Sequence, residues 1–455
     1  MTFRALMPIA IAALASCAAP GVATRDARDR PPLPPMRTFA TVQASPPGRA
    51  NADITRDFLD LSFRLESGRE LERFTRFEGP VTLRVAGPAP QSLDADLSRL
   101  LGRLRGEARI NITRVPADRA ANVTVQIVPR AEMRRAVPAA ACFVVPRIAD
   151  WADFLRNRRG PAIDWSTLET RERLAIFIPG DVAPQEVRDC LHEELAQALG
   201  PLNDLYRLPD SVFNDDNFHT VLTGFDMLIL RATYSGDLRS GMTRAEVARR
   251  VPGIVARLNP AGGRPRPVAA DPTPRIWIEA IETAFGPDVP SARRQGAAMD
   301  AVAIAGAERW EDVRLAFSLY ALGRLSLGDA PNLAFGAFLR AAEIYGREPA
   351  TRIHEAHIAM QIAAFALASG EPAAAVEIVD ANTDAVIAAQ NAALLSTLLM
   401  VKSEALRDMG REGESQQLRT EALGWARYGY GDASEIRRRA AEIAAIAPQR
   451  REAGS

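Results

Sequence analysis

The hydrophobic pattern of this 455-residue chain changes near residue 260, and the change limits the folds that it can adopt. Before that point, short apolar runs with strand-like alternation are interleaved with helical stretches. From residue 275 onward the apolar residues follow the 3.6-residue period of helices. Residues 260–274 between the two parts are rich in Gly and Pro, which is typical of a linker. The sequence therefore predicts an α+β protein, with a mixed α/β domain at 51–259 and an all-α domain at 275–446.

Alternating or continuous apolar runs predict the strands of the first domain. They cover residues 81–85, 110–113, 123–128, 142–145 and 174–178. Helical spacing and capping residues predict the helices before, between and after them. These cover residues 51–78, 93–104, 151–158, 184–200, 221–234 and 244–258.

Turn signals recur in the all-α domain at Gly328, Gly370 and Gly410, with spacings of 42 (370 − 328) and 40 (410 − 370) residues. Each follows a longer helix and precedes a shorter one, as in a helical-hairpin array whose units bury their core by stacking on neighbours. The array resembles tetratricopeptide repeats, although its period is longer than theirs. An unrelated helical bundle is the alternative. As an array, this domain is expected to bind a protein or peptide partner. The pair His354 and His357 is expected on its surface.

The first residues predict export and lipidation. Arg4 precedes an apolar run that is too short to span a membrane and ends in Leu14-Ala15-Ser16-Cys17. This pattern resembles a lipobox, which makes residues 1–17 a lipoprotein signal peptide with Cys17 as the lipidated residue. With Ala18 after it, the resemblance implies an anchor in the outer membrane, with the folded part facing the periplasm. An ordinary signal peptide is the alternative.

Two further segments and the charge complete the organisation. Residues 18–50 are rich in Pro and are expected to form a disordered tether, and residues 447–455 a disordered tail. The chain has 56 basic and 56 acidic residues. A net charge of zero gives no field that would favour nucleic acid. Contact with a membrane is therefore expected only through the lipid.

Two cysteines remain in the α/β domain, Cys142 and Cys190. In an oxidising compartment they could pair in a disulfide. Two buried free thiols and a catalytic thiol are the alternatives, and the sequence alone leaves all three open.

The strongest candidate for a functional site lies on the helix that follows the last predicted strand. Zinc peptidases of the zincin type use H-E-x-x-H, in which two imidazoles one turn apart hold the metal and the glutamate activates water. Starting the motif at His192 makes Glu193 the glutamate and Ala196 the second ligand. Starting it one residue later makes Glu194 the glutamate and Gln197 the second ligand. Neither register has two histidines.

Helix geometry places Glu194 within the apolar stripe of this helix, with Gln197 and His192 on its margins. A carboxylate on an apolar face needs a partner or a raised pKa. Three interpretations follow: a structural polar network, a ligand- or peptide-binding cleft without catalysis, and a working metal hydrolase. In the hydrolase, Glu193 or Glu194 would be the general base and His192 a metal ligand.

Oxygen-bearing side chains after this helix are the other candidates for a binding cleft, together with Gln197. They are Asn203, Asp204, Asp210, Ser211, Asn214 and Asp226. The loop after the helix is rich in oxygen donors that suit calcium, namely Asn203, Asp204, Asp210, Asn214, Asp215, Asp216 and Asn217. Their spacing matches no EF-hand loop, and Asn and Asp also favour turns for local reasons. We expect no cofactor, with zinc or calcium as the alternatives.

The same stretch carries a family resemblance. The run from Leu191 to Gly200, followed by Asn203-Asp204, 210–214 and 225–228, resembles the domain of unknown function 2927. The resemblance covers roughly residues 50–250 and implies a zincin-like fold, without implying a mechanism. The sequence therefore favours a non-catalytic binding protein of the cell envelope with a degenerate metallopeptidase-like domain. A divergent zinc-dependent metallopeptidase is the alternative.

Overall fold

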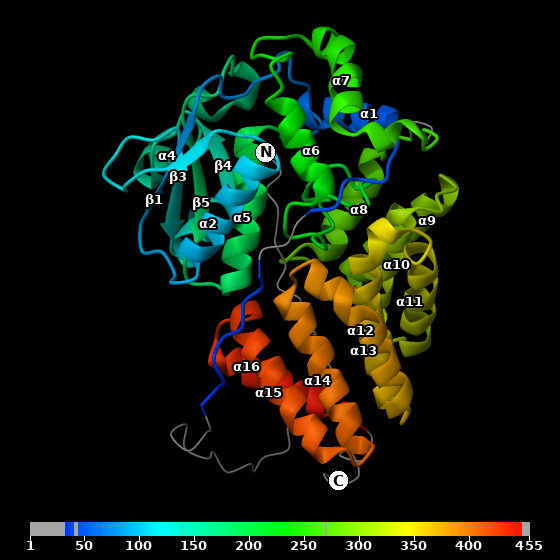
Figure 1. The fold of residues 1–455 in the computed structure, drawn as a ribbon. Coiled ribbons are helices and arrows are strands. Elements are labelled where there is room, and N and C mark those ends of the chain that lie inside the picture. The colour runs from blue at the N-terminus through cyan, green and yellow to red at the C-terminus, as the bar shows by residue number, and fades with distance from the viewer. Residues whose placement is uncertain (1–31, 41–43, 139, 269–270, 448–455) are drawn as a thin grey trace. The chain divides into compact units, whose positions relative to one another are not determined.

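The computed structural model describes residues 32–40, 44–138, 140–268 and 271–447, which fall into two compact units (Figure 1). We call residues 44–273 the α/β unit, and residues 32–40 with 274–447 the helical unit. The expected signal peptide with Cys17, the first part of the tether and nearly all of the C-terminal tail lie outside the described residues. Within the described ranges, no helix has the length and apolar character needed to cross a membrane.

A five-stranded sheet in the order β2-β1-β3-β5-β4 forms the centre of the α/β unit, among the residues described. Four strands are parallel, and β4 runs antiparallel to β5 at the end of the sheet. Every predicted strand is present, and the mixed α/β fold class is confirmed. The strands are β1 (Val81–Ala86), β2 (Ile112–Arg114), β3 (Val123–Val128), β4 (Phe143–Pro146) and β5 (Leu174–Pro179).

The sheet is covered on both faces, which explains why β5 is apolar throughout. Ile176 and its neighbours two residues away pack into one core cluster with α2 and α5, whereas Ala175 and Phe177 pack into another with α3 and α4. The helices of this unit are α1 (Asn51–Ser62), α2 (Leu93–Gly106), α3 (Arg130–Ala136), α4 (Trp151–Asn157), α5 (Pro184–Leu199), α6 (Gly224–Thr233) and α7 (Arg244–Leu258). Short 3-10 helices lie at Pro161–Ile163, Trp165–Thr167, Val212–Asn214 and Pro260–Gly263.

The predicted helix at 51–78 was too long, because α1 ends at Ser62. The following chain folds back on itself: Leu71 N donates to Phe63 O and Leu65 N donates to Arg69 O. Gly68 has a φ of 81°, a left-handed conformation that glycine adopts without strain. The apolar spacing continued past the true end of the helix and concealed this turn.

All regular secondary structure in the described residues 274–447 is helical, and consecutive helices pack on one another from α8 to α15. Gly370 and Gly410 have left-handed φ values after α12 and α14, as expected for glycines that end helices. The helices are α8 (Arg275–Phe285), α9 (Ser291–Ala307), α10 (Val313–Ser326), α11 (Pro331–Tyr345), α12 (Arg352–Ala368), α13 (Pro372–Ala388), α14 (Ala392–Asp408), α15 (Glu412–Gly429) and α16 (Ala433–Ala444), with a 3-10 helix at Pro349–Thr351. The predicted helix-rich array is confirmed.

The surface position expected for His354 and His357 was wrong, since both side chains are buried. The ring centroid of His354 lies 4.9 Å from that of Tyr345, and His357 Nε2 lies 3.4 Å from Asn391 Nδ2. Helix α12 packs against α11, α13 and α14, so the face that carries these histidines is enclosed.

Part of the segment expected to be disordered is ordered. Residues 32–40 are extended and lie against the helical unit, where Arg37 N donates to Gly424 O over 3.0 Å. We call these residues the N-terminal strap. A Pro-rich segment cannot form a core of its own, but here it finds partners on a preformed helix surface.

Arg171 holds the C-terminal end of α5, the helix that carries the candidate motif. Its buried guanidinium donates to the backbone oxygens of Gln197, Ala198 and Gly200 over 2.5–2.8 Å. The last carbonyl oxygens of a helix have no N–H donor within the helix, so the guanidinium supplies the missing hydrogen-bond donors. Burial lowers the pKa of Arg171 to about 10, so the group stays charged at neutral pH.

We expect Arg171→Met to lower the free energy of unfolding by about 2–4 kcal/mol, because it leaves three buried carbonyl oxygens without donors. Urea denaturation of the full chain measures the change. The matched control is Arg173→Met, since Arg173 is exposed and should stay within about 0.5 kcal/mol of wild type. Equal losses in the two variants would contradict the capping role.

Candidate functional site

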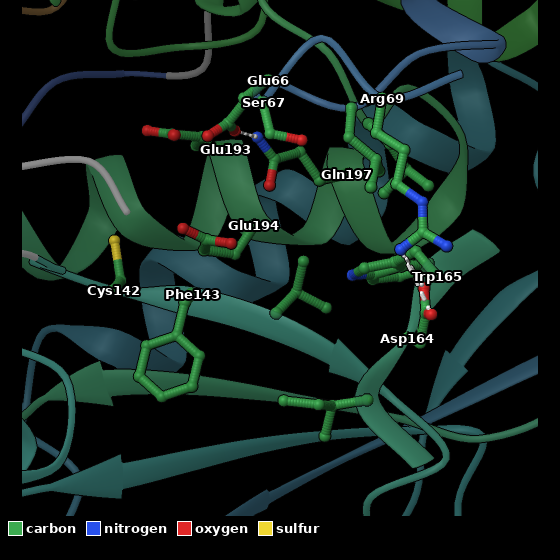
Figure 2. A pocket seen from close by; sticks show the side chains of 14 residues that line it. Glu66, Ser67, Arg69, Cys142, Phe143, Asp164, Trp165, Glu193, Glu194 and Gln197 are labelled. Carbon is green, nitrogen blue, oxygen red and sulfur yellow. Dashed lines mark hydrogen bonds and ion pairs between the residues drawn. The ribbon is translucent and has the colours of Figure 1, made fainter. Parts of the chain in front are cut away.

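A pocket of about 280 Å³ opens beside α5 in the α/β unit (Figure 2). Its walls come from α5, from β4 and the residue before it, from the turn after α1 and from the 3-10 helices after α4. Its volume is far more than one water molecule needs. The lining residues are Leu65, Glu66, Ser67, Arg69, Cys142, Phe143, Val144, Ile163, Asp164, Trp165, Glu193, Glu194, Gln197 and Leu202.

Carboxylates dominate the polar part of this pocket. Glu193 and Gln197 lie on the side of α5 that faces Glu66, and Gln197 Nε2 donates to Glu66 Oε1 over 3.3 Å (Figure 2). Glu194 lies between the helix and β4 (Figure 2). The side chains of Glu193 and Glu194 are almost fully buried, so polar contacts with them form in surroundings of low dielectric constant.

Arg69 and Asp164 occupy the opposite end of the pocket, beside Trp165 (Figure 2). Arg69 Nη1 lies 3.2 Å from Asp164 Oδ1, so the positive charge of Arg69 is balanced by its own partner. The hydrogen bond from Ser166 Oγ and the charge of Arg69 lower the pKa of Asp164. This pair brings one positive and one negative charge together at that end, and Glu66, Glu193 and Glu194 contribute three further carboxyl groups to the lining.

The tight connection between β5 and α5 sets the position of the helix. A Cβ atom on Gly180 would lie 2.3 Å from Ile127 Cγ2, so glycine is needed where the chain leaves the sheet. Pro184 then starts α5 in its first turn, where a missing N–H costs nothing. At the far end Arg171 caps the helix, so both ends of the wall that carries the glutamates are fixed.

A disulfide between Cys142 and Cys190 ties α5 to the start of β4, with the two Cα atoms 6.0 Å apart. The sequence left three roles open for these cysteines, and the structure has them paired. Cys142 lines the pocket, and Cys190 lies one helical turn before Glu194. The bond therefore fixes the spacing of the two walls between which Glu194 lies.

His192 does not take part in the pocket. Its Nδ1 accepts a hydrogen bond from Leu222 N over 3.2 Å, on another side of α5. Burial, together with the positive charge of Arg188, lowers the pKa of His192 well below its ordinary value. Among the residues that the structure describes, no group of three or more His, Cys, Asp or Glu side chains is placed to hold a metal ion.

Of the seven residues proposed for a cleft, the structure brings only Gln197 to the pocket. Asn203 Nδ2 donates to Asp60 O, and Asn214 Nδ2 donates to Leu208 O. Asp204 is not among the lining residues. Asn214 thus holds the backbone of its own loop, whereas Asn203 ties the chain after α5 to α1.

Asp226 joins the loop after α5 to the start of α6. It forms a capping box with Thr223 and accepts hydrogen bonds from Ser211 Oγ and Val212 N. Burial raises its pKa, although these hydrogen bonds oppose that change. Asp226 and Ser211 thus link this loop to the start of α6, and neither lines the pocket.

Asp210 pairs with Arg49, whose Nη2 lies 2.6 Å from Asp210 Oδ1. Arg49 also pairs with Asp57 at 2.8 Å and lies over the Phe225 ring. Burial raises the pKa of Asp210 from 3.8 to about 6 despite the opposing charge of Arg49.

Sequence reasoning missed Glu66, Arg69, Asp164 and Trp165. Glu66 and Arg69 were assigned to a continuous helix, and the signal for a turn there was Ser67-Gly68. Asp164 and Trp165 follow a Gly-Pro pair that indicates a loop, but no local pattern shows which way a loop faces.

The comparisons with known proteins give one match. The family model described as "Protein of unknown function (DUF2927)" matches residues 51–253, which run from α1 into α7. No curated protein and no solved structure matches the chain. The match includes the disulfide and every residue that lines the pocket, and the helical array lies outside it.

We expect the stability of the α/β unit to depend on pH through Asp210. Because the folded state raises this pKa from 3.8 to about 6, Asp210 stabilises the fold below pH 3.8, and that contribution is lost as the pH rises through about 6. Asp210→Asn should abolish this dependence. The difference in unfolding free energy between wild type and variant should fall by on the order of 3 kcal/mol from about pH 4 to pH 7. Chemical denaturation at both pH values measures it, and a difference that does not change with pH would argue against the raised pKa.

Proposed function

We propose that the chain is a lipid-anchored protein of the bacterial cell envelope whose α/β unit binds an extended peptide without cleaving it. The observation that carries the proposal is that Glu66, Glu193 and Glu194 line one pocket between α5 and β4. A ligand that enters this pocket meets three carboxylates, an amide and the Trp165 ring.

The charge of the pocket favours a cationic group. Lysine, arginine or an amino terminus would form charge-assisted hydrogen bonds with these carboxyl groups, and such attraction is strengthened where water is excluded. Arg69 at the other end of the pocket is paired with Asp164. A peptide or wall component with a basic side chain is therefore the ligand class that fits best.

The position of β4 supports an extended ligand. This strand ends the sheet order and pairs with β5 along one edge, while Phe143 and Val144 form part of the pocket wall. Extended peptides commonly bind by adding to an edge strand while a side chain enters a neighbouring pocket. The pocket beside β4 would then select one side chain of such a peptide.

The proposed location rests on two features. The Leu14–Cys17 pattern favours a lipid anchor. Because the residue after Cys17 is Ala18, the pattern favours the outer membrane. The Cys142–Cys190 disulfide supports an oxidising compartment such as the periplasm.

A divergent metal-dependent peptidase is the second candidate, favoured by the side-by-side position of Glu193 and Glu194 in the pocket. In such a peptidase, the carboxylate of Glu193 or Glu194 would act as the general base. The engagement of His192 with Leu222 supports binding instead, because the one imidazole of the motif is directed elsewhere.

We expect the full chain to bind the peptide acetyl-Ala-Ala-Lys-Ala-Ala-amide more tightly than the same peptide with Nε-acetyllysine, which lacks the positive charge. Glu194→Gln should weaken binding of the lysine peptide by a factor of about 10 to 100, because a buried charged hydrogen bond is worth about 1.5–3 kcal/mol. Isothermal titration calorimetry gives both affinities.

The control variant is Glu72→Gln, the same chemical change at an exposed position outside the pocket, which should leave the affinity unchanged. Equal affinity for the two peptides, or equal effects of the two substitutions, would refute an acidic recognition pocket.

A further inference from the structure

We propose that the surface of the helical unit beneath the N-terminal strap is a peptide-binding site, and that residues 32–40 occupy it in cis. A partner with the same chemistry, an extended segment with an arginine two residues before an aromatic residue, would take the site when the strap leaves. This inference concerns the helical unit alone and does not depend on the acidic pocket.

Backbone contacts hold the strap in an extended form. Arg37 N donates to Gly424 O over 3.0 Å, and Arg427 Nη1 donates to Pro34 O over 3.0 Å. At the end of the strap, Gln390 Nε2 donates to Ala40 O over 2.6 Å. Main-chain bonds of this kind accept many sequences, so they favour a general mode of holding an extended peptide.

Two side chains of the strap provide selectivity. Arg37 Nη1 lies 2.7 Å from Glu421 Oε1, and the Phe39 ring stacks on the Trp425 ring with centroids 4.5 Å apart. The Arg37 guanidinium also lies over the Trp425 ring, 5.9 Å from its centroid. One helix thus presents an acid for a cation and an indole for an aromatic ring, with matching spacing.

Gly424 opens the space for the backbone of the peptide. A Cβ atom at this position would lie 3.1 Å from Pro35 O and 3.2 Å from Arg37 Cγ. Glycine in the middle of a helix costs stability relative to alanine. Its presence in α15 is explained by the close approach of the strap.

The contacts of the strap are weak enough for another peptide to replace it. The side chains of Arg37 and Glu421 are 51% and 37% exposed, so their ion pair is screened by solvent and salt. Phe39 is only partly buried, and most of the strap residues are exposed. No strap side chain enters the core of the helical unit, so the strap can leave without opening that core.

The test uses the full chain and a fluorescent peptide with the sequence of residues 32–40, followed by fluorescence anisotropy. The double variant R37E/F39A weakens the binding of the strap to the site. The variant should bind the peptide with at least roughly tenfold higher affinity than wild type, because in wild type the tethered strap competes at a high effective concentration. Circular dichroism of the variant should show unchanged helix content, and its melting temperature should fall slightly, because the bound strap stabilises the native state.

Charge reversal identifies the site. Adding Glu421→Arg to the double variant should weaken binding roughly tenfold, and a peptide carrying R37E should restore it. Glu412→Arg is the matched control, an exposed acid on the same helix, and should have no effect. If the folded double variant does not bind the peptide, or if Glu421→Arg and Glu412→Arg act alike, the strap is a fixed structural element and the proposal is wrong.

Discussion

The candidate site depends most on the hydrogen bonds that the buried guanidinium of Arg171 donates to the end of α5. The guanidinium donates to three backbone oxygens at the C-terminal end of α5, a helix buried along nearly its whole length. A helix in this position cannot use water to satisfy its last carbonyls, so the protein buries a charge to do so. With its end held by Arg171 and its middle by the disulfide to Cys142, α5 presents Glu193 and Glu194 to the pocket in a fixed arrangement.

Local patterns predicted most of the fold. β3 was predicted with its observed bounds, because its alternating, mostly β-branched residues lie between Asn122 and Pro129 and favour a strand. The bounds of α7 were also predicted, since Thr243 and Glu246 form a capping box at its start. Such signals arise within a few residues of the element that they define, which is why a single sequence suffices for them.

Only part of the candidate site was predicted, because its residues come together only in the folded structure. Glu193, Glu194 and Gln197 were found from their helix, whereas Glu66 and Trp165 reach the pocket from turns far away in the sequence. Adjacent residues on a helix point about 100° apart, so the pocket can receive Glu193 while His192 faces Leu222. The strap was missed for the same reason, since 384 residues separate Arg37 from Glu421.

The central claim is that this helix serves recognition and not hydrolysis, and metal analysis combined with a cleavage assay tests it most directly. The full chain, purified without chelators, is analysed for zinc and incubated with the lysine peptide, which is then examined by mass spectrometry. Our account predicts an intact peptide, and a zinc content well below one per chain that does not change in His192→Ala. One zinc per chain that is lost in His192→Ala, together with a cleaved peptide, would contradict it.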